Sequence, residues 1–283
     1  MSAEGDFLVC PSMVTAAEAG NTAQLISALE YVQDIDFVDD QNETALHKAA
    51  AKGHKDIVQL LLSKGASIEA RDQLKCTPLH GAAWNGQTNT VELLLSKGAS
   101  IEAWDISNWT PLHCAAWNGQ TSTVELLLSK GASIEAWDIS NWTPLHCAAR
   151  YGHTSTVELL LSKGASIEAR DDCNWTPLQV AASEGQTSTV GLLLSKGASI
   201  EARDDSNWTP LHVAAFCGQT STVELLHSKG ASIAARDTLN RTPFDLAISN
   251  GKTDTAKPLQ NKAASADLLS QGNIRTAPEV IHT

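Results

Sequence analysis

The stretch TPLHCAAWNGQTSTVELLLSKGASIEAWDISNW, from Thr110 to Trp142, decides how this chain folds. Its opening TPLH recurs at a spacing of 33 residues, and its SKGAS recurs at the same spacing. Copies and near-copies of TPLH begin at Thr44, Thr77, Thr110, Thr143, Thr176, Thr209 and Thr242. A degenerate unit, marked by AAEAG at Ala16–Gly20, precedes the first of them. Such a period predicts a solenoid of about eight stacked units.

Each unit carries the signals of two helices and a turn. In the quoted copy, Thr110 suits the N-cap, and Pro111 suits the first helical position because its missing N–H needs no partner there. A second, amphipathic helix follows, and Gly131 suits a left-handed position after its end. The rest of the unit is extended. Asn stands two residues before the Thr in six units, where a tight turn with positive φ fits, and only Lys75 interrupts this row.

These features resemble the ankyrin repeat, a helix–turn–helix unit with a TPLHxAA motif, a second helix ending in LLxKGA, and a β-turn finger. The resemblance implies an all-α ankyrin-repeat solenoid that binds other proteins through its fingers and first helices. We expect an N-terminal tail at 1–5 and an ankyrin repeat domain at 6–272. Within that domain we expect a degenerate cap at 6–38, repeats at 39–71, 72–104, 105–137, 138–170, 171–203 and 204–236, and a C-terminal capping repeat at 237–272. A disordered tail is expected at 273–283.

The last unit departs from the pattern at Pro258, which replaces an interior helical leucine such as Leu225. A proline there would break a helix that begins at the usual place. We therefore expect a displaced last helix from about Pro258 to Gln271, with an apolar stripe that begins at Leu259.

The composition restricts the function classes that fit the chain. Its 283 residues carry 20 Lys and Arg against 32 Asp and Glu, a formal charge of −12, whereas binding nucleic-acid phosphates requires a surplus of basic side chains. No apolar run reaches the ~18 residues of a membrane span, and no signal-peptide pattern opens the sequence. Six scattered cysteines are typical of a reducing compartment. We expect a cytoplasmic protein, with the nucleus as an alternative, that binds neither nucleic acid nor membrane.

Histidine recurs in five units, at His47, His80, His113, His146 and His212. Packed helices lie about 8–10 Å apart, so histidines of neighbouring units cannot share a zinc ion at bonds of ~2 Å. The ankyrin resemblance gives this histidine a structural role, hydrogen bonding between adjacent repeats. The same spacing excludes a disulfide between Cys114 and Cys147, which we expect to be buried small apolar residues.

No motif of a nucleophilic, metal-dependent or phosphate-binding enzyme occurs in the sequence. We therefore expect no catalysis, metal, cofactor or small-molecule substrate, and a monomer that binds another protein or a peptide segment. The TST run before each second helix, as at Thr121–Thr123, fits helix-start capping on a solvated surface better than it fits a phosphorylation cluster.

All eight tryptophans fall in three rows that the ankyrin resemblance assigns to partner contact. The rows are the finger tip six residues before each Thr, the residue immediately before it, and the fourth residue after the His. Exposed apolar patches mark interaction sites, and Trp and Arg dominate binding hot spots. The candidate partner-binding residues are Trp84, Trp104, Trp109, Trp117, Trp137, Trp142, Arg150, Tyr151, Arg170, Trp175, Arg203, Trp208 and Phe216.

Part of this pattern also fits explanations other than partner binding, namely packing, duplication and charge neutralisation. A bulky residue just before TPLH partly packs on the next finger, and residues 104–116 are identical to residues 137–149, which fits one event copied by duplication. The arginines at the finger tips are each followed by aspartate, as at Asp171, Asp204 and Asp237, which fits simple neutralisation. The informative tryptophans are therefore those outside the second row, namely Trp84, Trp104, Trp117 and Trp137.

These observations predict a non-catalytic adaptor or scaffold that binds a partner protein through a Trp- and Arg-rich concave face. Two other functions stay open at this point. One is a stoichiometric inhibitor or assembly chaperone of a single partner, and the other is an effector directed into a host cell.

Overall fold

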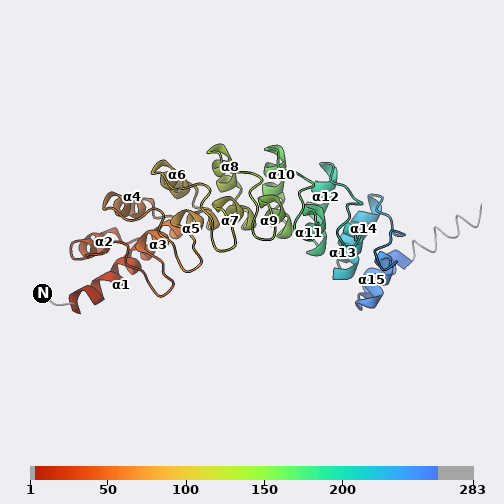
Figure 1. The fold of residues 1–283 in the computed structure, drawn as a ribbon, viewed down its shortest axis with the longest axis horizontal. Coiled ribbons are helices and arrows are strands. Elements are labelled where there is room, and N and C mark those ends of the chain that lie inside the picture. The colour runs from red at the N-terminus through yellow and green to blue at the C-terminus, as the bar shows by residue number, and fades with distance from the viewer. Residues whose placement is uncertain (1–3, 261–283) are drawn as a thin grey trace, which may run out of the picture. The chain divides into compact units, whose positions relative to one another are not determined.

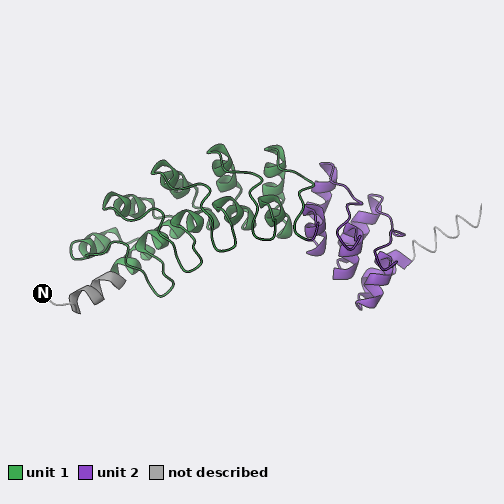
Figure 2. Ribbon diagram, in the orientation of Figure 1, with its two compact units in different colours: residues 1–172 green, residues 173–283 purple. Residues whose placement is uncertain are grey.

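A computed structural model describes residues 4–260, with side chains from residue 12 onward. Contacts divide the chain into two compact units, Met1–Asp172 and Cys173–Thr283 (Figure 2). The described residues form helices in repeated helix–turn–helix pairs, and one antiparallel bridge joins Val38 to Thr44. The prediction of an all-α repeat fold is confirmed. None of the helices in this range combines the length and apolarity that a membrane span requires.

In the first unit, successive first helices pack against one another, and so do the second helices from the second pair onward (Figure 1). The first helices of the pairs are α1 (Glu4–Ala19), α3 (Ala45–Lys52), α5 (Pro78–Trp84), α7 (Pro111–Trp117) and α9 (Pro144–Arg150). The second helices are α2 (Thr22–Leu29), α4 (Lys55–Ser63), α6 (Thr88–Ser96), α8 (Thr121–Ser129) and α10 (Thr154–Ser162). Helix α1 begins two residues before the boundary at residue 6 that the sequence suggested.

The second unit repeats the same arrangement. Its helices are α11 (Pro177–Ser183), α12 (Thr187–Ser195), α13 (Pro210–Cys217), α14 (Thr220–Ser228) and α15 (Pro243–Ser249). A further helical segment runs from residue 253 to residue 260, where the described range ends.

From α5 onward, the start of each first helix follows from its Thr-Pro sequence, whereas α3 begins after Thr44 without a proline. Thr110 is the N-cap of α7 in an extended conformation, Pro111 is the first helical residue, and Thr110 and His113 form a capping box. The helix core is made of small side chains, since Ala115 and Ala116 are fully buried. Small residues allow neighbouring first helices to pack closely.

The finger turns adopt the left-handed conformation that the Asn row predicted. The φ angles lie between 59° and 64° at Asn42, Lys75, Asn108, Asn141, Asn174, Asn207 and Asn240. Lys75 therefore keeps the same turn at φ 61°, although its side chain does not favour it. A left-handed non-glycine residue costs about 1–2 kcal/mol, and Asn reduces that cost by local hydrogen bonding.

The prediction that the last helix has a displaced start at Pro258 is wrong. The helical segment begins at residue 253, on the 33-residue register of the other second helices, and passes through Pro258. Burial explains why the proline does not break it: Ala256 and Leu259 are 2% and 1% exposed. The Thr255 hydroxyl also lies 2.7 Å from the hydroxyl of Thr220 in the preceding second helix. The rest of the predicted helix and the tail at 273–283 lie outside the described residues.

The TST runs also differ from the prediction of solvated helix starts. Helix α8 begins at Thr121, its N-cap is Gln120, and that side chain makes no capping hydrogen bond. The hydroxyl of Thr121 lies 2.8 Å from that of Thr156 in the next pair, and Thr156 is fully buried. The threonines therefore join successive second helices.

Candidate partner-binding surface

The repeated histidine is a bridge between adjacent units. The Thr110 backbone N–H donates to Nδ1 of His113 at 3.2 Å, and Nε2 lies 3.0 Å from the Trp142 carbonyl oxygen. An N–H can only donate and a carbonyl can only accept, so the ring is neutral with its proton on Nε2. Gln179 makes the same two contacts with its amide oxygen and nitrogen. Burial lowers the pKa of His113, which fits this neutral, structural role.

The tryptophans just before TPLH are held by aspartates of the next finger. Trp109 Nε1 donates to Oδ2 of Asp138 at 3.0 Å, and Trp142 Nε1 donates to Oδ2 of Asp171 at 3.1 Å. The other oxygen of Asp138 accepts the backbone N–H of Trp142 at 2.8 Å and so fixes the turn. These half-buried tryptophans anchor one finger to the next, as the packing interpretation expected.

The arginine row donates to backbone carbonyls. Arg203 Nη1 lies 3.1 Å from the carbonyl oxygens of both Asn207 and Arg236, so it joins two successive fingers. The following residue, Asp204, accepts the Trp175 indole N–H at 2.9 Å and the backbone N–H of Trp208. The two neighbours thus serve different hydrogen bonds, and neutralisation does not explain their pairing in this unit.

Trp104 and Trp137 occupy the arginine row but stay exposed. Their side chains are 52% and 62% accessible. They line an open cavity of ≈ 460 Å³ between their fingers, together with Glu102, Asn108 and Glu135. An indole at this place cannot reproduce the two carbonyl contacts of an arginine, because it has only one donor. These two rings therefore contribute apolar surface at the finger tips.

A second group of rings crosses the first helices α5, α7 and α9. Trp109 lies 4.7 Å from Trp117 between ring centroids, and Trp117 lies 4.4 Å from Tyr151. Trp84 adjoins this group, 6.3 Å from Trp109. The Arg150 guanidinium lies 5.5–6.0 Å from the centroids of Trp142, Trp117 and Tyr151. At that distance a cation is attracted by the negative faces of the rings.

Comparison with known proteins assigns this geometry to a family. The family model for ankyrin repeats (3 copies) matches residues 13–105, 69–138, 103–171, 136–204 and 178–271. The chain belongs to the ankyrin repeat family. Among solved structures, the crystal structure of the human ASB11 ankyrin repeat domain is similar, with 29% sequence identity and a TM-score of 0.67. The match covers 72% of this chain and 92% of that domain. No curated protein matches the sequence significantly.

Ankyrin repeats are in general non-catalytic modules that bind other proteins. The sequence prediction of a protein-binding repeat is confirmed at this level. The arrangement in the first unit adds exposed rings, an adjacent arginine and a cavity between fingers.

The candidate residues of the second unit form a smaller ankyrin surface. The rings of Trp208 and Phe216 lie 5.0 Å apart, and Phe216 is 37% exposed. Trp175 is half-buried and Arg203 is exposed. Arg170, which belongs to the first unit, is also exposed.

Sequence reasoning missed three exposed aliphatic residues on the ankyrin fingers of the first unit. Leu74, Ile106 and Ile139 are 55%, 52% and 62% exposed, and they accompany Trp104 and Trp137. The available signal was an aliphatic residue inside each polar turn sequence, Asp-Gln-Leu at 72–74 and Asp-Ile-Ser at 105–107 and 138–140, because such a residue has no role in folding a solvated turn. Leu74, Trp84, Trp104, Ile106, Trp137, Ile139 and Tyr151 together are named the aromatic surface below.

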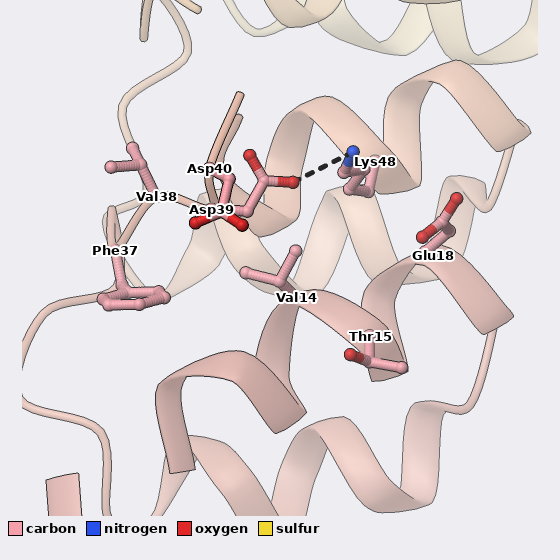
Figure 3. A pocket seen from close by; sticks show the side chains of 8 residues that line it. All are labelled: Val14, Thr15, Glu18, Phe37, Val38, Asp39, Asp40 and Lys48. Carbon is pink, nitrogen blue, oxygen red and sulfur yellow. Dashed lines mark ion pairs between the residues drawn. The ribbon is translucent and has the colours of Figure 1, made fainter. Parts of the chain in front are cut away.

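A cavity of ≈ 370 Å³ near the N-terminus lies apart from these residues. Figure 3 shows Lys48 turned toward Asp39 beside Val14 and Phe37. The Lys48 ammonium lies 3.0 Å from Asp39 and also pairs with Glu43, so its charge is already compensated. This cavity lacks exposed indole rings among its lining residues and is not the candidate surface.

Proposed function

We propose that this ankyrin repeat protein is a non-catalytic adaptor or scaffold that binds a partner protein through the aromatic surface. The observation that carries the proposal is the exposure of Trp104 and Trp137 at finger tips where arginines otherwise join the fingers. Burial is what makes an apolar side chain favourable, so the exposed parts of these two indoles add little to stability. Among the described residues, the Trp104 ring has only the cations of Arg71 and Lys75 near its face, 5.9 and 5.8 Å from its centroid. The placement of the two indoles is consistent with selection for contact with a partner.

The distribution of hydrophobic and charged groups also favours a protein partner. The exposed rings and aliphatic tips are interleaved with Glu102, Glu135 and the Arg150 guanidinium. Interface cores are rich in aromatic residues and arginine, with polar groups at the rim. The aromatic surface therefore has the composition of a standard protein interface.

Two repeat histidines and two cysteines of the first unit are engaged in structure, which supports a function without catalysis. The Nδ1 and Nε2 atoms of His80 and His113 are both in hydrogen bonds. Burial raises the pKa of the Cys114 and Cys147 thiols well above its usual value, and a thiol is a weak nucleophile without ionisation.

Affinity capture with mass spectrometry tests the proposal. The wild-type chain is compared with the double variant Trp104→Ala/Trp137→Ala and with the control Tyr31→Ala/Leu239→Ala, which also removes two exposed apolar side chains. We expect a set of proteins retained by the wild type and the control and lost by the tryptophan variant. Equal retention by all three proteins would place partner binding elsewhere.

A further inference from the structure

The first unit contains a cavity that arises from two small residues in the repeat. It has a volume of ≈ 310 Å³ and is lined by residues of the first helices α3, α5 and α7 and of the fingers before them, among them Cys76, Gly81, Trp84 and Trp109. Cys76 stands where the next four units have Trp, and Gly81 stands where they have Cys or Val. The cavity is at the small end of ligand sites, which are about 300–1,000 Å³. The cavity is therefore large enough for one side chain of a partner.

The missing tryptophan leaves a carboxylate oxygen without its usual donor. In four later fingers the equivalent aspartate accepts an indole N–H of the preceding unit at 2.9–3.1 Å. Asp105 uses Oδ1 for the backbone N–H groups of Ser107 and Trp109. Because Cys76 replaces the indole, no donor among the described residues contacts Oδ2 of Asp105. This oxygen belongs to a residue that lines the cavity.

The charges around the cavity are negative. Its lining includes Glu43, Asp72 and Asp105 and no Lys or Arg side chain. Glu43 already pairs with Lys48, whereas Asp72 and Asp105 act as negative charges on Cys76 and Arg71 acts as a positive charge. Burial and these two carboxylates raise the pKa of the Cys76 thiol to about 12. The hydrogen bonds of the Arg71 guanidinium go to the carbonyl oxygens of Lys75 and Trp104, not to the carboxylates of the cavity.

Two contacts elsewhere in the chain show which side chain such a site accepts. Asp237, the equivalent of Asp105, accepts both the Trp208 indole and Nε of Arg241 on Oδ2, the latter at 2.8 Å. The Arg150 guanidinium lies 5.5–6.0 Å from the ring centroids of Trp142 and Tyr151 in its own repeat and of Trp117 in the preceding repeat. A guanidinium is planar, stacks on indoles and donates in parallel to carboxylates.

We propose that this cavity binds an arginine side chain of the partner, which stacks on Trp84 and Trp109 and donates to Oδ2 of Asp105. The inference rests on the proposed function, because it names the partner chemistry for one end of the aromatic surface. The partner segment therefore carries an arginine next to apolar residues that cover the finger tips.

Nuclear magnetic resonance titration with N-acetyl-arginine amide tests the site without the partner. We expect saturable shifts of the Trp84 and Trp109 indole N–H signals in the millimolar range, and binding weaker by about tenfold or more for the neutral isostere N-acetyl-citrulline amide. Absence of saturable shifts would overturn the site. Equal binding of citrulline or of N-acetyl-lysine amide would contradict recognition of a guanidinium.

Two variants sharpen this test. Cys76→Trp supplies the indole of the other units and fills the cavity, so it should abolish binding while the thermal midpoint is kept or raised. Asp105→Asn keeps the oxygen that caps the turn and removes the charge, so binding should fall by about tenfold or more. The control Glu224→Gln removes one negative charge, as Asp105→Asn does, but at an exposed position on α14. It should bind N-acetyl-arginine amide like the wild type. Unchanged binding in Cys76→Trp would show that the shifts arise elsewhere.

The partner assay separates this inference from the proposed function. If Trp104→Ala/Trp137→Ala loses the partner and Cys76→Trp keeps its full affinity, the surface binds a partner but the arginine site is wrong. If both variants keep full affinity while the titration succeeds, the cavity recognises guanidinium and the proposed function is wrong.

Discussion

At the residue scale, the finger turns show that the repeat imposes a positive φ whether or not the side chain favours it. The Asn row and its positive φ were predictable, because Asn tolerates the left-handed region better than other non-glycine residues. Lys75 adopts φ 61° without that advantage. We expect Lys75→Asn to raise the free energy of unfolding by up to about 1 kcal/mol, measured by urea denaturation. Asn240→Lys, at φ 63°, is the matched reverse change and should lower it by a similar amount. Equal stability of all three proteins would contradict the account of the turn.

The buried histidines predict how stability depends on pH. Burial lowers the pKa of His47, His80, His113 and His212 from the ordinary value of 6.5. The unfolded chain therefore binds more protons than the folded chain in acid, so this stabilisation is complete above about pH 6.5 and is lost as the pH falls below it. We expect the thermal midpoint to fall between about pH 7 and pH 5.

The natural glutamine of the repeat provides the control for this dependence. His113→Gln should keep both hydrogen bonds, as Gln179 does, and should reduce the fall of the thermal midpoint in acid. A variant with the same pH dependence as the wild type would show that other groups cause the acid destabilisation.

At the element scale, the last helix shows where local sequence rules fail. Pro258 disfavours a helix by its missing N–H and its ring, yet the helix begins on the repeat register, because Leu259 and Ala256 are buried in the unit. Packing against the preceding pair therefore outweighs the local preference. Such a balance was not predictable from propensity, since it depends on burial in the stacked neighbour.

If packing outweighs the local preference, Pro258 lowers the stability of the folded protein, and replacing it should raise that stability. Pro258→Ala should raise the thermal midpoint, with a gain in unfolding free energy of up to about 3 kcal/mol. Leu259→Ala should lower it, since the side chain is only 1% exposed. A lower midpoint for Pro258→Ala would indicate that the proline ring itself is needed for packing.

At the scale of the whole molecule, the repeat period was sufficient to predict the ankyrin family and the helical pairs. The candidate surface was predictable only in part. The exposure of Trp104 and Trp137 was predictable from the row they occupy. The hydrogen bond from Trp109 to Asp138 was not, because it depends on where the next finger lies. The cavity beside Cys76 was likewise not predictable, because the sequence does not show that the tryptophans of the other repeats donate to aspartates of the next finger. Periodicity describes what the units share, whereas function depends on where they differ.

The most direct test of the central claim is calorimetric measurement of partner affinity for Trp104→Ala/Trp137→Ala, combined with its free energy of unfolding. We expect affinity to fall by at least about tenfold, since each hot-spot ring contributes on the order of 2 kcal/mol, while stability changes little because both rings are exposed. The control Tyr31→Ala/Leu239→Ala should bind with wild-type affinity. Intact affinity together with a loss of several kcal/mol in stability would mean that these tryptophans hold the fingers and that the partner binds elsewhere.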